Sequence, residues 1–399
     1  MYAYMLRCRV DAFRGFTAYS QVHVKEQALQ ILANERLVLQ KVDEFVTKHS
    51  IPCDFNRTTT FDVCMTPEFA EYEAASLDAY RDAGGDVSHI TCYTGKEAQE
   101  KTRVPGAVVA YEWPAASIHP AKLVQFLLHT VISRGVRLFT FCPATEIKQN
   151  AATHGSGLLW DVHTPRGIVT AEKIIHCTNA HAALLLPCLN AFITPNRAQA
   201  HSIIPTPAFT GDGILRNTFS LRYSLHHFYS LIQRQEDGAF ILGSSRSNPT
   251  LSKETIASRL STDDTKYNAE IVQDALRSFG QIFPDYHSES LMHGEGLDHA
   301  WTGIIAMTTD SVPFVGEIES LPGQFVCAGF NGHGKFVLYR NSDFRTKLFA
   351  GMARIFTCAP GVAKLVLGGK WCETGLPDCF QINKDRMVRL SSKAVPSVW

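Results

Sequence analysis

The feature that most constrains this chain is a glycine-rich turn at residues 329–334, which reads Gly-Phe-Asn-Gly-His-Gly. It follows the short apolar segment 324–328, whose composition is typical of a strand. Glycine lets a backbone turn sharply and lets its N–H groups come close to an anionic or polar ligand. The pattern therefore indicates a ligand site at the end of a strand, with a plain tight turn as the alternative.

The usual partner of such a turn, a G-x-G-x-x-G motif after a first strand, does not occur in the sequence. Residues 1–7 read Met-Tyr-Ala-Tyr-Met-Leu-Arg and lead directly into a helical pattern. The sequence therefore carries the late half of a dinucleotide-binding site without the early half.

Composition narrows the class of partner. The 399 residues carry a formal net charge of zero, which argues against nucleic acid or an anionic membrane surface as the main partner. The longest apolar runs, such as residues 182–186, are far too short to span a membrane. The first residues lack the layout of a signal peptide, and the 11 cysteines contain no C-x-x-C pair. We expect a cytoplasmic protein with reduced thiols, no metal site and a small-molecule partner.

Hydrophobic periodicity predicts both helices and strands. Apolar residues recur at helical spacing in four segments, namely 25–49, 66–81, 120–134 and 267–283. Thr66 followed by Pro67 is a strong helix start. Strands are predicted at 54–64, 136–140, 158–162, 168–170, 173–177, 228–234 and 239–243, with 173–177 expected to be buried. The predicted fold class is α/β (α+β mixed), with an incomplete Rossmann-like domain interleaved with an antiparallel-sheet domain.

Four segments, taken in order, resemble one known family. They are residues 143–147, residues 174–181, residues 301–304 with 309–316, and the turn at 329–334. Together they are similar to the FAD-dependent oxidoreductases of the D-amino-acid oxidase type, which include glycine and sarcosine oxidases. Each segment is weak alone, and their order and spacing carry the resemblance, which covers roughly residues 8–368.

The resemblance implies FAD as cofactor and an amine or amino acid as substrate. It implies that residues 1–50, 116–196 and 301–370 belong to the FAD-binding domain, residues 51–115 and 197–300 to the substrate domain, and residues 371–399 to a tail. It also implies hydride transfer from the carbon beside nitrogen, followed by hydrolysis of the imine. Residues expected at the cofactor are Thr145, Thr178, Asn179, Asp310, Pro313, Asn331, Gly332, His333 and Gly334.

Other residue roles stay open at this stage. His333 is either a turn residue or faces the flavin. Four residues are candidates to line a substrate pocket in the sheet domain, namely Arg222, Tyr223, His226 and Tyr229. The alternative is that they are ordinary half-exposed positions of an antiparallel strand. Flavin attachment is conceivable at Cys188, Cys327 or Cys358, although buried thiols are the simpler reading. No catalytic base can be named.

Two departures from the family pattern raise a rival hypothesis. Without the glycine motif, the negative charges of the FAD diphosphate would lack backbone N–H donors. The rival hypothesis is therefore a non-catalytic fragment or pseudoenzyme that does not bind FAD. A nicotinamide-dependent reductase is disfavoured because no second dinucleotide motif occurs. Residues 335–350 interrupt the expected passage from turn to helix. Gly334-Lys335 can be encoded GGT-AAG and Ala350-Gly351 GCA-GGN, so we hypothesise a retained intron; the alternative is a surface insertion. The unusual first residues suggest that the chain is truncated.

Overall fold

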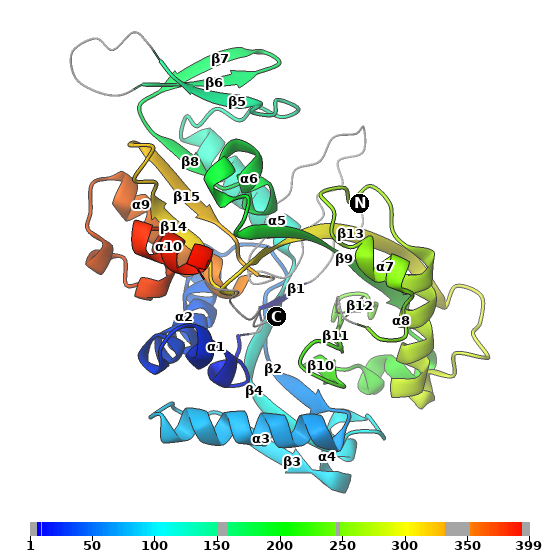
Figure 1. Cartoon of the computed structure of the whole chain (residues 1–399). Coiled ribbons are helices and arrows are strands. Elements are labelled where there is room, and N and C mark those ends of the chain that lie inside the picture. The colour runs from blue at the N-terminus through cyan, green and yellow to red at the C-terminus, as the bar shows by residue number, and fades with distance from the viewer. Residues whose placement is uncertain (1–5, 9, 151–158, 245–247, 332–351, 393–399) are drawn as a thin grey trace.

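A computed structural model describes residues 6–8, 10–150, 159–244, 248–331 and 352–392. Its largest element is a mixed sheet that crosses the centre of the molecule (Figure 1). Neighbouring strands in this sheet run in the order β1 (Leu6–Cys8), β4 (Val109–Ile118), β2 (Asn56–Cys64), β10 (Thr218–Arg222), β11 (Phe228–Gln233), β12 (Phe240–Ser244), β9 (Ile193–Ile204) and β13 (Gly296–Thr308), while β3 (Thr91–Thr94) pairs with β4. The predicted strand at 54–64 and the predicted hairpin at 228–243 are confirmed.

Alternation along these strands separates the two faces of the sheet. On β10, Phe219 and Leu221 belong to an apolar cluster that also contains Ala275 and Phe279 of helix α8 (Ala269–Ile282). Asn268 caps α8, because its side-chain oxygen accepts hydrogen bonds from the first-turn amides. The face covered by α8 is therefore apolar. The alternate residues of these strands, such as Ser220 between Phe219 and Leu221, point to the opposite face.

A second, smaller sheet contains a parallel pair of strands that lie far apart in the sequence. Its order is β14 (Phe314–Glu317), β15 (Gln324–Ala328) and β8 (Ile174–His176), and β15 runs parallel to β8. Helix α9 (Met352–Val366) and helix α10 (Lys384–Ser392) lie beside this sheet in Figure 1. The predicted strand at 173–177 is confirmed, but its expected burial is wrong, since Ile175 is 45% exposed. In the described chain β8 pairs only with β15, so one of its edges is open.

A third sheet projects at one end of the molecule (Figure 1). It consists of β5 (Glu146–Gln149), β6 (Trp160–Thr164) and β7 (Gly167–Ala171), which confirms the predicted hairpin. The Trp160 indole donates a hydrogen bond to the carbonyl of Pro322, 2.9 Å away, and so ties this sheet to the loop before β15.

The helices begin and end where capping residues place them. Thr66 accepts a hydrogen bond from the amide of Phe69 and caps α3, as predicted, and all four predicted helices are confirmed. The remaining helices frame the sheets. The helices before α8 are α1 (Phe16–Val22), α2 (Lys25–Lys48), α3 (Pro67–Asp82), α4 (Gly95–Thr102), α5 (Pro120–Ser133), α6 (Ala182–Leu185) and α7 (Lys253–Ala257).

One predicted strand is wrong. Residues 136–140 follow α5 as irregular chain, and Val136, Leu138 and Phe139 are exposed. A strand needs a neighbour to receive its backbone hydrogen bonds, and none of the described strands pairs with this segment. The overall class, a mixed α/β protein, is as predicted. None of the described helices combines the length and the apolar character needed to cross a membrane.

Candidate active site

The turns that follow β8 and β15 meet at one end of the small sheet. The side-chain oxygen of Asn179 accepts hydrogen bonds from the backbone N–H groups of Gly329 (3.0 Å) and Phe330 (3.3 Å). Asn179 is buried and has a left-handed backbone with φ +48°. The carboxyl ends of parallel strands are where ligands bind in α/β sheets, so the structure brings two predicted cofactor segments together at such a place.

Asn331 holds the second turn against the end of β13. Its side chain accepts a hydrogen bond from the amide of Thr308 (2.6 Å) and donates to the Thr308 hydroxyl (2.7 Å). Its own backbone N–H donates to the carbonyl of Ala306 at 2.8 Å. Asn331 therefore positions the turn, and its backbone N–H is not available to a ligand. Gly332, His333 and Gly334 lie outside the described residues, as does the segment 335–350.

Asp310 and Pro313 are bound by one arginine of α10. Arg386 pairs with both carboxylate oxygens of Asp310, each at 2.9 Å, and also donates to the carbonyl of Pro313. His23 donates from Nε2 to the backbone carbonyl of Asp310 at 2.7 Å. Burial is the main reason that the pKa of His23 falls to about 4, so this imidazole is neutral. The side chain of Asp310 is consumed in fixing this segment.

The two predicted threonines lie at exposed positions. Thr145 lies just before β5, where its hydroxyl and its amide both donate to the carbonyl of His163. Thr178 directly precedes Asn179, and its carbonyl accepts from the amide of His181 at 3.0 Å. Thr178 thus shares the strand-end turn, whereas Thr145 belongs to the projecting sheet.

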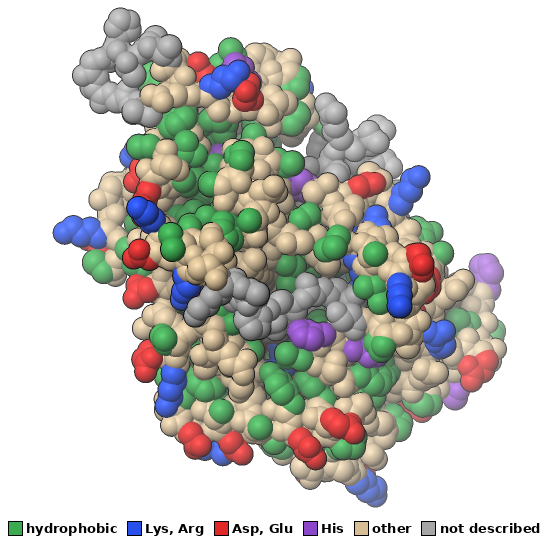
Figure 2. All heavy atoms as spheres, viewed as in Figure 1, with side chains coloured by type: hydrophobic (Ala, Val, Ile, Leu, Met, Phe, Trp, Pro, Cys, Tyr) green, Lys and Arg blue, Asp and Glu red, His purple; other side chains and the backbone are tan. Residues whose placement is uncertain are grey.

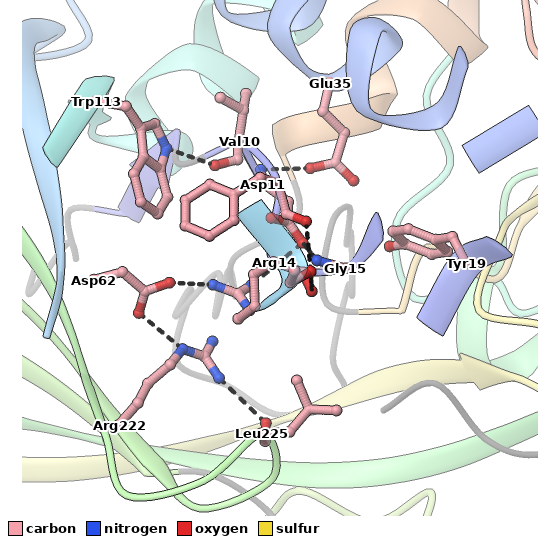
Figure 3. Close-up of polar contacts among 12 residues, drawn as sticks. Val10, Asp11, Arg14, Gly15, Tyr19, Glu35, Asp62, Trp113, Arg222 and Leu225 are labelled. Carbon is pink, nitrogen blue, oxygen red and sulfur yellow. Dashed lines mark hydrogen bonds and ion pairs between the residues drawn. The ribbon is translucent and has the colours of Figure 1, made fainter. Parts of the chain in front are cut away.

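Arg222 belongs to a buried ionic network (Figure 3). Its Nε lies 3.0 Å from Asp62 on β2, and the other oxygen of Asp62 accepts a hydrogen bond from Arg14. The Arg222 guanidinium also lies over the Phe228 ring, 4.1 Å from its centroid. Burial lowers the pKa of Arg14, but the carboxylates of Asp11 and Asp62 outweigh this and raise it above its ordinary value. Both arginines are therefore charged and paired inside the protein.

Glu73 lies in the same environment with a different charge state. It is fully buried, and neither carboxyl oxygen has a hydrogen-bond partner in the described part of the chain. Burial, with a contribution from Asp62, raises the pKa of Glu73 well above its ordinary value. The carboxyl is consequently neutral, since an unpaired buried carboxylate would be very costly.

The network reaches from the large sheet to the segment that follows β13. Asp11 lies 3.5 Å from Arg14 and donates from its backbone N–H to Glu35 at 2.8 Å. Glu35 pairs with Arg354 at 2.8 Å, and Arg354 in turn donates to the carbonyl of Ser311 at 2.9 Å. Arg222 is therefore connected through buried groups to the segment that holds Asp310.

The other predicted substrate residues have surroundings of their own. Tyr229 is the cross-strand partner of Leu221, so it faces α8, where its hydroxyl donates to Asp274 at 2.7 Å. Tyr223 stacks on His227, with ring centroids 4.8 Å apart. His226 lies half-buried in the turn between β10 and β11.

Sequence reasoning missed most of this network. Arg14, Glu35, Asp62, Glu73 and Arg354 are all fully or almost fully buried. One signal was available, because Asp62 interrupts the apolar run between Phe61 and Val63 in a predicted strand. A charged residue in such a place is seldom buried unless it has a partner.

Fold and site together define a class of protein. A small α/β unit with two parallel strands, β8 and β15, is joined to a large mixed sheet, as in nucleotide-binding α/β proteins. A sequence model described as "FAD dependent oxidoreductase" (DAO) matches residues 15–335. The chain belongs to this family, as the resemblance predicted.

Known proteins agree with this assignment. The chain is 20% identical over 310 residues to the probable oxidoreductase OrdL of Haemophilus influenzae, which covers 73% of this chain and 61% of that relative. The chain thus spans less than two thirds of the length of this relative. L-proline dehydrogenase from P. horikoshii superposes with a TM-score of 0.66 at 17% identity, covering 88% of this chain and 82% of that one. Glycine oxidase from Geobacillus kaustophilus superposes with a TM-score of 0.64 at 19% identity, covering 90% and 84%.

The described residues fit one end of an FAD molecule better than the other. The hydroxyls of Thr309 and Ser311 are buried without a hydrogen-bond partner in the described chain, and they lie beside the Asn331 turn, so they can serve the polar edge of a flavin. The amides of Gly329, Phe330 and Asn331 are all bonded within the protein, so they cannot hold a diphosphate. The fit therefore rests on the ring end.

The face of the molecule seen in Figure 2 carries no large patch of one charge. Acidic and basic side chains are interspersed there, mostly toward the outline, and neither sign gathers into a broad patch. Among the described residues, no group of His, Cys, Asp and Glu side chains could hold a metal ion.

Proposed function

We propose that this protein oxidises the C–N bond of an amine or an amino acid with FAD as cofactor. The observation that carries the proposal is the buried network from Arg222 to Ser311. It connects Arg222 on the large sheet with the loop beside the two strand-end turns, and this supports the proposal that substrate and cofactor would bind at the two ends of one buried network. Family membership supports the same reaction class.

When bound, FAD supplies the two-electron acceptor for oxidation of the C–N bond to an imine, which water then hydrolyses. The protein's own contribution is orientation. Arg222, which pairs with Asp62 and lies over the Phe228 ring, would orient a polar substrate at the end of β10. No general base is assigned, because a neutral amine needs none to lose a hydride.

The cofactor contacts are part of this proposal. The backbone around Asp310 and Pro313, with the hydroxyl of Ser311, would face the ring. Thr178 and Asn179 would lie at the strand-end turn, and Thr145 nearer the adenine. Asn331 would position the chain that follows it, and Gly332, His333 and Gly334 would supply the remaining contacts. A cytoplasmic location, favoured by the cysteine usage, belongs to the same proposal.

The rival function is a non-catalytic protein that does not bind FAD. This alternative is supported by the backbone N–H groups of residues 329–331, which already donate to acceptors within the protein. The family match favours the enzyme. The two differ in one measurement. The enzyme hypothesis expects a purified protein with the absorbance bands of oxidised flavin, and these bands should bleach when an amine is added without oxygen.

An Arg222→Met variant sharpens this experiment, since Asp62 keeps Arg14 as a partner. We expect it to retain flavin and to need a higher amine concentration for bleaching. Arg57→Met on β2, whose guanidinium is exposed and pairs with Asp43, is the matched control. A colourless protein that takes up no added FAD would refute the proposed function.

A further inference from the structure

Two cysteines lie side by side where the parallel strands of the small sheet end. Strand β8 pairs with β15 in a register that places His176 beside Val326. One residue further along both strands, the same register places Cys177 beside Cys327. The two thiols therefore lie just before the two turns that the side chain of Asn179 joins.

Both thiols belong to the face of the sheet that carries α9. Cys327 is 6% exposed and is part of the apolar cluster that contains Cys358 of this helix. Residues side by side on parallel strands point to the same face, so Cys177 shares this face with Cys327. Burial raises the pKa of Cys327 well above its ordinary value, and the nearby thiols of Cys358 and Cys177 raise it further. Three thiols thus lie close together at the carboxyl ends of the two strands.

The three thiols differ in their access to solvent. Cys358 is fully buried and Cys327 nearly so, whereas Cys177 is exposed. Helix α9 packs on β14 and β15, while β8 is the last strand of the described sheet. Ile175 lies on the same face of β8 as Cys177 and is 45% exposed. A small oxidant in solution therefore meets Cys177 first.

The spacing of neighbouring strands suits a disulfide between Cys177 and Cys327. Adjacent strands lie about 4.8 Å apart, and the Cα atoms of a disulfide are usually about 4.4–6.8 Å apart. Cys177 lies one residue beyond β8, where strand pairing no longer fixes the backbone. Cys358 lies in a different layer, and packed layers are about 10 Å apart, too far for a disulfide without backbone movement.

The thiols are expected to be reduced at rest. The cysteines that the structure describes, from Cys53 to Cys379, are free. Burial raises the pKa of Cys177 above its ordinary value, so little of this thiol is ionised at neutral pH. The thiolate is the form that reacts with oxidants, so Cys177 reacts slowly unless the oxidant is abundant.

We propose that Cys177 and Cys327 form a redox-sensitive pair, reduced at rest and joined by a disulfide when hydrogen peroxide is abundant. The Cys177 sulfur attacks one oxygen of the peroxide, the O–O bond breaks, and a sulfenic acid and one water are formed. The Cys327 sulfur then attacks the sulfenic sulfur, the S–S bond forms, and a second water leaves. Two electrons pass from the two thiols to one peroxide, and both thiol protons leave in the water.

The disulfide would tie together covalently the strand ends whose turns Asn179 joins by hydrogen bonds. Because the two cysteines are far apart in the sequence, the bond closes a long loop of the unfolded chain and so favours the folded state. We expect the melting temperature to rise by several degrees on oxidation. This inference goes beyond the proposed oxidation of amines and does not depend on it.

Peptide mass spectrometry of the full chain tests the pairing. The reduced protein is treated with hydrogen peroxide at about pH 8.5, where more thiolate is present, then blocked with N-ethylmaleimide and digested with trypsin without a reductant. We expect peptides 174–197 and 278–335 to be joined within one chain. The proposal would be overturned by the absence of a cross-link, by a disulfide between two copies of the chain, or by a link from 174–197 to 355–364, the peptide of Cys358.

Two variants identify the reacting thiol. Cys177→Ser should abolish both the cross-link and the rise in melting temperature. Cys188→Ser should keep both, and it is the matched control because Cys188 is also exposed and lies in the same tryptic peptide. A cross-link that survives in Cys177→Ser or disappears in Cys188→Ser would contradict the assignment.

Thermal unfolding gives the second readout. A melting temperature that oxidation leaves unchanged or lowers would show that the bond does not fit the native sheet, and would also overturn the proposal. None of these measurements requires flavin or turnover, so a negative result leaves the proposed function intact. A colourless protein that still forms the cross-link would refute the proposed function and leave this inference standing.

Discussion

Asn179 accepts a hydrogen bond from the backbone N–H of Gly329, 150 positions further along the chain, at 3.0 Å. The same oxygen also accepts from Phe330, so one side chain satisfies two buried amides of the opposite turn. Because β8 and β15 run in parallel and end side by side, this bond sets the spacing of the two turns that follow them.

Replacing Asn179 by Ala should destabilise the protein by about 1–3 kcal/mol. Two buried amides would lose their acceptor, and alanine is disfavoured at a φ of +48°. Urea unfolding measures the change. Asn190→Ala, at an exposed position in the same segment, is the control and should stay within about 0.5 kcal/mol of the parent chain. An equal stability of the two variants would contradict the role of Asn179.

Gly329 should tolerate no side chain. Its φ is +84°, and an added Cβ would lie 2.4 Å from Cγ2 of Thr308. Gly329→Ala is expected to cost more than about 1 kcal/mol, from backbone strain and from the clash together.

Thr308→Ser removes that methyl and keeps the hydroxyl that binds Asn331. The double variant should therefore regain part of the stability that Gly329→Ala loses, but not the part due to φ. Thermal unfolding of the three variants separates the two contributions. Strict additivity of the two substitutions would show that no clash exists.

The pair between Arg386 and Asp310 should be strongly coupled. Arg386→Met leaves the Asp310 carboxylate buried without its partner, and we expect a loss of about 3–5 kcal/mol. Asp310→Asn combined with Arg386→Met removes both charges and should be less destabilised than the single Arg386 variant. Arg389→Met, an exposed arginine of the same helix, controls for loss of a cation. A double variant less stable than Arg386→Met would argue against this interpretation.

His23 should make the stability depend on pH. Burial lowers its folded pKa from 6.5 to about 4, so between these values the unfolded chain binds a proton that the folded chain does not. Its contribution is fully present above pH 6.5 and is lost as pH falls toward 4, by up to about 3 kcal/mol.

His23→Gln keeps a donor near the Asp310 carbonyl but cannot titrate in this range. Urea unfolding at neutral and at acidic pH should give a shallower pH dependence for this variant. Some dependence will remain, because burial also lowers the pKa of His201 to about 4. Parallel pH profiles for parent and variant would exclude His23 as a source.

Local sequence patterns predicted much of the secondary structure. Residues 25–49 show the helical spacing of α2, Thr66 and Pro67 start α3, and Asp237-Gly238 marks the hairpin between β11 and β12. These signals are short-range, since caps, periodicity and turn residues act within one or two turns of the chain. The same reasoning failed at residues 136–140, where β propensity was high but none of the strands that the structure describes pairs with the segment.

The residues of the site divide along the same line. The sequence by itself determined the two turns, at Asn179 and at Gly329, because strand ends and glycine are visible locally. Only the tertiary structure decided that Asp62 lies between Arg14 and Arg222, that Tyr229 faces α8, and that Cys177 lies beside Cys327. Strand register and the pairing of buried charges join residues up to hundreds of positions apart, and no local pattern encodes which of them will meet.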